Sequence, residues 1–102
     1  MSAALELRKA AAERVLVKDG AYGTLIQAEG LKEADFRGDL AFNHDQRGNN
    51  DLLNLTRPEV IRNIAGRFVT SGADILATNT FNANSISQSD YGAESLVADI
   101  NR

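Results

Sequence analysis

The sequence has no cysteine and no tryptophan, and it has only one proline and one histidine among its 102 residues. Without cysteine, these residues can form neither a disulfide bond nor a thiolate metal site. The single histidine, His44, lies in an irregular stretch beside Asp45, with no cysteine or second histidine to complete a ligand set. We therefore expect that residues of this chain alone bind no metal and no cofactor.

Long apolar runs and basic clusters are missing as well. No segment approaches the roughly 18 apolar residues of a membrane span. Glu6, Arg8 and Lys9 interrupt the alanine-rich N-terminal stretch, where a secretory signal has an apolar core. Lysine and arginine are scattered and the net charge is -3 at pH 7, so nothing favours nucleic-acid binding. The expected location is cytoplasmic, with neither a membrane nor a nucleic acid as partner.

The remaining composition is that of a globular domain, with 43% hydrophobic and 25% charged residues. A chain of 102 residues is long enough for one small domain and too short for two. Two short apolar runs, residues 15–18 and residues 74–78, each end abruptly in polar side chains. This pattern is typical of buried parallel strands whose carboxyl ends open onto a binding site. The sequence therefore predicts an α/β fold with a shared site at one edge of a parallel sheet.

The segment between these two runs contains the clearest helix signal. Thr56 is placed to cap the amide of Glu59, and Pro58 suits the first turn. Apolar residues then recur at helical spacing as far as Val69, and Gly72 stands where a left-handed C-terminal cap belongs. A strand, a helix and a second strand in this order predict a right-handed parallel crossover unit.

Other parts of the chain are also predicted to be helical. Helices are expected at residues 3–14, 22–28 and 93–102, with a short helix within residues 82–90. Gly30 is the expected stop of the helix at residues 22–28. Residues 31–55 lack periodicity, but apolar anchors such as Phe36 predict an ordered loop folded over the domain surface.

Five motifs occur together in one order along the chain. They are Asp19-Gly20-Ala21-Tyr22-Gly23-Thr24, Asp35-Phe36-Arg37-Gly38, Gly48-Asn49-Asn50-Asp51-Leu52-Leu53, Thr56-Arg57-Pro58-Glu59-Val60-Ile61, and Gly72-Ala73-Asp74-Ile75 with Thr78-Asn79-Thr80-Phe81-Asn82. Together they resemble the start of the homocysteine-binding domain of the cobalamin-dependent methionine synthases, in the homocysteine S-methyltransferase family. The resemblance runs from about residue 13 to residue 102. The second and third motifs resemble methionine synthase more than the related betaine-homocysteine methyltransferases.

This resemblance implies a (β/α)8 TIM barrel of about 250 residues, with its site at the carboxyl ends of the strands. Residues 1–13 are then an N-terminal helical extension, and residues 14–102 are the N-terminal portion of the barrel, with two strand-helix units and the long ordered loop. In that family, zinc held by three cysteines binds the homocysteine sulfur, which takes its methyl group from methylcobalamin. None of those cysteines occurs here, so zinc and cobalamin are implied for the full-length enzyme only.

The resemblance also implies which residues recognise homocysteine. Asp19 resembles the acid beside the substrate ammonium, and the backbone amides of Gly20 and Gly23 are placed to approach the substrate carboxylate. Thr78 resembles a threonine that bonds to the amino or carboxylate group.

Each of these roles has a structural alternative. An acid at the end of a strand forms a turn with the glycine that follows, and a threonine hydroxyl bonds to neighbouring backbone. Asn79, Thr80 and Asn82 are weaker candidates for substrate contacts. Phe81 either caps the barrel core or forms a wall of the substrate or methyl-donor pocket.

The preferred interpretation is part of a methionine synthase that supplies the amino-acid-recognition side of the homocysteine pocket and is inactive by itself. Its expected partners are homocysteine, the remainder of the barrel, and the cobalamin and folate modules of the same protein. Two alternatives stay open: a related thiol methyltransferase with another donor, and a small α/β binding fragment without catalysis.

Overall fold

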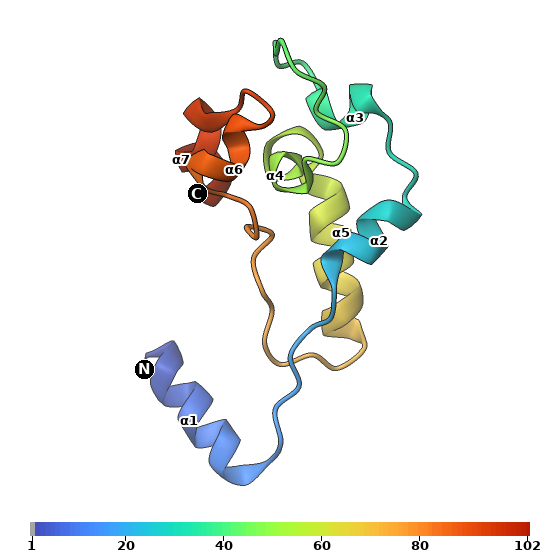
Figure 1. The fold of residues 1–102 in the computed structure, drawn as a ribbon. Coiled ribbons are helices and arrows are strands. Elements are labelled where there is room, and N and C mark those ends of the chain that lie inside the picture. Colours follow the sequence, from blue (N-terminus) through green and yellow to red (C-terminus); the bar gives the residue numbers. More distant parts are fainter. Residues whose placement is uncertain (1) are drawn as a thin grey trace.

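Helices account for nearly all the regular structure in the computed structural model, which describes residues 2–102 (Figure 1). In chain order they are α1 (Ala3–Glu13), α2 (Tyr22–Ala28), α3 (Glu33–Arg37), the 3-10 helix η1 (Asn50–Leu52), α4 (Leu53–Thr56), α5 (Pro58–Thr70), α6 (Ser85–Ser89), the 3-10 helix η2 (Glu94–Leu96) and α7 (Val97–Asn101). None of the helices in this described part of the chain is long and apolar enough to cross a membrane.

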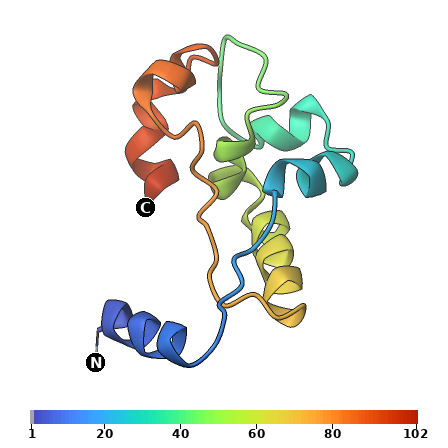
Figure 2. The same ribbon diagram turned by 60° about the horizontal axis from the view of Figure 1, so that its bottom comes forward.

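The prediction of strands at residues 15–18 and 74–78 is wrong for this structure. The two segments do lie side by side and run in the same direction, but within residues 2–102 they form only one isolated parallel bridge, between Lys18 and Ile75. Figures 1 and 2 show them as extended blue and gold segments that follow α1 and α5. A parallel strand is stable when it has neighbours and both faces of its sheet are covered. In residues 2–102 each of these segments has only the other as a neighbour for strand pairing. The strand-helix units of a barrel are therefore not seen.

Helix α5 forms where the sequence predicts it. Pro58 lies in its first turn, and Ile64 is buried with 1% of its surface exposed. At the end of the helix, Gly72 adopts a φ of 106°, and the Ala73 amide reaches back to the Phe68 carbonyl oxygen at 2.9 Å. This is the Schellman arrangement, which requires the positive φ that glycine adopts freely. The predicted C-terminal cap is therefore confirmed.

The predicted N-terminal cap of α5 is wrong. Thr56 is the last residue of α4, and its hydroxyl donates to the Leu52 carbonyl oxygen at 3.3 Å. Arg57 stands at the cap position and makes no side-chain hydrogen bond to the helix. Because α4 buries Leu53 completely, the chain is already helical when it reaches Thr56, and the hydroxyl bonds back within that turn.

The apolar core lies where α2, α3, α4 and α5 meet. Its buried members are Ile26, Phe36, Leu53 and Ile64, and the partly buried side chains packed against them are Tyr22, Leu25, Leu31, Val60, Ile61 and Phe68. The rings of Tyr22 and Phe68 stack with their centroids 5.7 Å apart. This contact fixes the start of α2 against α5, and the start of α2 carries part of the site described below.

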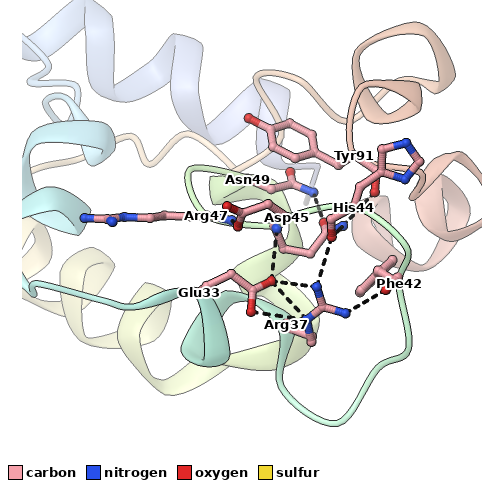
Figure 3. A network of polar contacts seen from close by, with 9 residues as sticks. Glu33, Arg37, Phe42, His44, Asp45, Arg47, Asn49 and Tyr91 are labelled. Carbon is pink, nitrogen blue, oxygen red and sulfur yellow. Dashed lines mark hydrogen bonds and ion pairs between the residues drawn. The ribbon is translucent and has the colours of Figure 1, made fainter.

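The stretch predicted as an ordered loop, residues 31–55, contains α3, η1 and α4, so it is more regular than expected. Arg37 organises its irregular part (Figure 3). The Arg37 guanidinium pairs with Glu33 at 2.8 Å and donates to the carbonyl oxygens of Phe42 at 2.8 Å and His44 at 3.0 Å. These hydrogen bonds from Arg37 to backbone carbonyl oxygens hold the loop in one conformation, although it forms neither a strand nor a helix.

The helices predicted at residues 3–14, 22–28 and within 82–90 are confirmed as α1, α2 and α6, whereas the one predicted at residues 93–102 is divided into η2 and the short α7. Helix α1 buries none of its residues and lies apart from the core in both views (Figures 1 and 2). Helices α6 and α7 come together through a turn at Gly92, whose φ is 65°. Ile100 of α7 and Ala93 are the apolar residues that this C-terminal group buries.

Candidate functional site

A cavity of about 350 Å³ lies where the two extended segments end. Its wall combines residues that follow the first segment, residues 77–82 at and beyond the end of the second, and residues of η1 and of the loop before it. They are Gly20, Tyr22, Gly23, Gly48, Asn50, Asp51, Ala77, Thr78, Asn79, Thr80, Phe81 and Asn82. Among the residues predicted to bind substrate, all except Asp19 line this cavity. The structure thus brings both polar stretches to one place, even though neither preceding segment is a strand.

Asp19 lies behind the wall. Its side chain has 0% of its surface exposed and accepts hydrogen bonds from the Ala77 amide at 2.9 Å and the Lys18 ammonium at 3.1 Å. Burial raises the pKa of Asp19, but the hydrogen bonds from Ala77, Lys18 and Tyr22 outweigh burial and hold this pKa below its ordinary value. The carboxylate therefore stays charged and ties the two segments together.

The two glycines differ in their surroundings. A Cβ on Gly20 would lie 3.1 Å from the Phe68 ring, so that position has little space for a side chain. A Cβ on Gly23 would meet nothing within 4 Å. A side chain at Gly20 would therefore press on the Phe68 ring, whereas Gly23 leaves an open stretch of cavity wall on α2.

Thr78 and Thr80 present a pair of hydroxyl groups. Their oxygens are 2.6 Å apart and one hydroxyl donates to the other. The pair is exposed, and the donor of one hydroxyl and the free lone pairs of both remain available to a ligand in the cavity. These two hydroxyl groups are therefore candidates for contact with a ligand.

The side-chain amide of Asn79 is already used in hydrogen bonds within the chain. Its amide nitrogen donates to the Asn50 carbonyl oxygen at 2.8 Å and to the Asn54 side-chain oxygen at 3.0 Å. Asn54 returns a bond to the Asn79 carbonyl oxygen at 2.8 Å. Phe81 differs again, because 94% of its surface is exposed at the mouth of the cavity. The structure thus places Asn79 in the wall as a support and Phe81 at its rim.

Asp51 is a site residue that the sequence interpretation missed. It lines the cavity with 3% of its surface exposed, and its carboxylate accepts from the Asn82 amide at 2.9 Å. Burial raises the pKa of Asp51, and the bond from Asn82 opposes this only in part. The signal was the motif Gly48-Asn49-Asn50-Asp51, which supported the resemblance but was not assigned to the pocket.

The geometry of the cavity indicates the kind of ligand that it can bind. A small cavity bordered by one carboxylate, hydroxyls and backbone amides, at the ends of two parallel extended segments, is suited to a small zwitterionic molecule. A protein-family model described as homocysteine S-methyltransferase matches residues 16–102, which include every residue of the cavity wall. The chain belongs to the homocysteine S-methyltransferase family. Membership gives it a methyltransferase context and implies homocysteine as the substrate.

This family uses zinc, and the residues of this chain do not fit that metal. The sequence has no cysteine, and residues 2–102 contain no group of three or more histidine, cysteine, aspartate or glutamate side chains placed to hold a metal ion. His44 lies in the irregular loop and takes no part in the cavity wall.

Proposed function

We propose that this chain is the amino-acid-recognition side of a homocysteine pocket in a methionine synthase, within a (β/α)8 barrel that the remainder of the protein completes in the cytoplasm. The observation that carries the proposal is the cavity that unites the polar ends of both extended segments. Family membership supports homocysteine as its occupant.

The charges around the cavity match the two ends of an amino acid. Asp51 brings a carboxylate to the wall, and a carboxylate attracts the ammonium group of an amino acid. Asp19 already holds an ammonium, that of Lys18 at 3.1 Å, and Lys18 itself is 62% exposed. The ammonium group of homocysteine is chemically similar to that of Lys18. We therefore propose that it binds Asp19 either by displacing the Lys18 ammonium or through a bridging water.

The carboxylate of homocysteine needs hydrogen-bond donors, and other residues of the wall supply them. The backbone near Gly20 and Gly23 lies at the start of α2, where amide groups lack partners within the helix. The hydroxyl pair of Thr78 and Thr80 adds a donor that can turn toward a ligand. We assign the substrate carboxylate to this side of the cavity and the thiol to its open mouth near Phe81.

Binding of L-homocysteine to the complete native protein, measured by isothermal titration calorimetry, tests this assignment. We expect saturable binding, and Thr78→Val should weaken it about fivefold, since one hydrogen bond is worth about 1 kcal/mol. Thr70→Val is the matched control, because Thr70 lies at the exposed end of α5 and outside the cavity wall. Absence of saturable binding by the unaltered protein would overturn the proposal.

The choice of methionine synthase within the family rests on the motifs at Asp35-Phe36-Arg37-Gly38 and Gly48-Asn49-Asn50-Asp51. Formation of methionine by the complete protein, assayed separately with methylcobalamin and with betaine as donor, tests that choice. Methylcobalamin should support the reaction and betaine should not. Activity with betaine alone would identify a different member of the family.

A further inference from the structure

A ring of buried amide side chains stands directly behind the cavity wall. Asn49 and Gln88 are 2% and 0% exposed, and each donates to the other, at 2.9 Å from Asn49 to Gln88 and at 3.0 Å in return. Neither side chain lines the cavity. They come from segments that are 39 residues apart in the sequence.

The ring continues into two residues that do line the cavity. The second hydrogen of the Gln88 amide goes to the Asn82 carbonyl oxygen at 3.1 Å, and the Asn82 amide donates to Asp51 at 2.9 Å. Asp51 follows Asn49 by two residues, which closes the ring through the backbone. Both backbone polar groups of Asn82, its N–H and its carbonyl oxygen, are therefore bonded to side chains from elsewhere in the chain.

Every amide donor in this group is used. Asn49 gives its other hydrogen to the Gln46 side-chain oxygen at 3.1 Å, and Gln46 donates to the carbonyl oxygens of Tyr91 at 2.6 Å and His44 at 3.2 Å. Figure 3 shows Asn49 between the irregular loop and Tyr91. A buried amide network with all its donors satisfied selects one arrangement, since any other leaves a polar group without a partner.

We propose that Asn49 and Gln88 are positioning residues for homocysteine, and this inference rests on the function proposed above. Gln88 holds the Asn82 carbonyl oxygen, and Asn49 lies two residues before Asp51, so the pair fixes how Asp51 and Asn82 lie against each other in the cavity wall. These residues lie in segments without strand pairing, so hydrogen bonds from side chains take the place of a sheet in holding them. The pair thus preorganises the cavity without touching the substrate.

The test compares the complete native protein with its variants. Titration calorimetry measures their affinity for L-homocysteine, and thermal melting measures their stability. Asn49→Ala and Gln88→Ala should each weaken binding about tenfold. The exchange variant carrying both Asn49→Gln and Gln88→Asn keeps two amides and the same number of methylene groups, and should bind within about threefold of the unaltered protein. Ile64→Val is the control, because it lowers stability from the core on α5 and should leave affinity unchanged.

The possible outcomes distinguish failure of the proposed function from failure of this inference. If the unaltered protein does not bind homocysteine, the proposed function fails. If it binds and the alanine variants melt earlier but bind equally well, the pair is structural only and this inference is overturned. If the alanine variants do not fold, hydrogen exchange in the unaltered protein decides: homocysteine should slow exchange of the Asn82 amide, and unchanged exchange overturns the inference.

Discussion

Arg14 and Asp74 form a two-bond ion pair across 60 residues of sequence, with nitrogen-oxygen distances of 2.9 and 2.8 Å. The same carboxylate accepts from the Val17 amide at 2.9 Å. The pair joins the end of α1 to the segment after α5, and in the described part of the chain these two segments share only one isolated bridge. It therefore holds the two extended segments together at the end remote from the cavity.

The first prediction concerns acid stability. The hydrogen bonds from Arg14, with that from Val17, lower the pKa of Asp74 from 3.8 to about 2. Because the folded pKa is depressed, this contribution to stability is complete above about pH 4 and is lost as the pH falls from there toward 2. Asp74→Asn should lower the urea midpoint at pH 7 and flatten its fall over this range.

Asp99→Asn is the control for that experiment, because the Asp99 carboxylate is 52% exposed and lies 3.9 Å from Arg102. Exposed pairs of this kind contribute little. An unchanged acid profile in Asp74→Asn would show that the ion pair does not hold the segments together.

The second prediction separates two glycines. Gly92 has a φ of 65°, and a Cβ there would lie 2.5 Å from Nδ1 of His44. Gly66 lies within α5, and a Cβ there would meet nothing within 4 Å. Gly92→Ala should destabilise the fold by about 1–2 kcal/mol, whereas Gly66→Ala should stabilise it by about 0.5–1 kcal/mol. Denaturant midpoints at neutral pH give both values, and equal effects would contradict the left-handed turn at Gly92.

The third prediction concerns two aspartates whose pKa values move in opposite directions. Burial raises the pKa of Asp51, and Arg14 lowers that of Asp74. In a carbon-13 NMR titration of the side-chain carboxyls, Asp51 should therefore take up its proton at a higher pH than any free aspartate, and Asp74 at a lower one. Folding should become more favourable as Asp51 protonates, since the folded state binds that proton more tightly. The reverse order of titration would contradict the burial of the Asp51 carboxyl group in the cavity wall.

The fourth prediction concerns association of the 102-residue chain by itself. Val15 and Val17 are 86% and 53% exposed, and Leu76 on the neighbouring segment is 43% exposed. Unpaired extended backbone beside exposed apolar side chains favours pairing with another chain. Sedimentation should show concentration-dependent dimers or larger species, and Val15→Lys should reduce them. Val69→Lys, on the exposed side of α5, should have a smaller effect, and a monomer at all concentrations would contradict the prediction.

Local signals account for most of the correct predictions. Gly30 and Gly72 end α2 and α5 because positive φ costs glycine little, and both adopt it here. Pro58 begins α5 because the first helical turn needs no amide donor at that position. These rules act over a few residues, so they hold whatever the rest of the fold does.

The predicted strands and the Thr56 cap failed for the opposite reason. An extended run becomes a strand only when neighbours pair with it, and residues 15–18 and 74–78 have one bridge between them. Thr56 bonds backward to Leu52 because α4 precedes it. The strands depend on pairing partners elsewhere in the fold, and the Thr56 hydrogen bond depends on the helical turn that immediately precedes it.

The sequence by itself determined the family, the positions of the main helices and the two polar stretches that border the cavity, since each follows from local motifs and helical periodicity. Only the tertiary structure decided how the stretches meet. It placed Asp19 behind the wall, brought Asp51 into it, and paired Asn49 with Gln88. Buried polar groups must find partners wherever the fold brings them together, and sequence spacing does not reveal which partners those are.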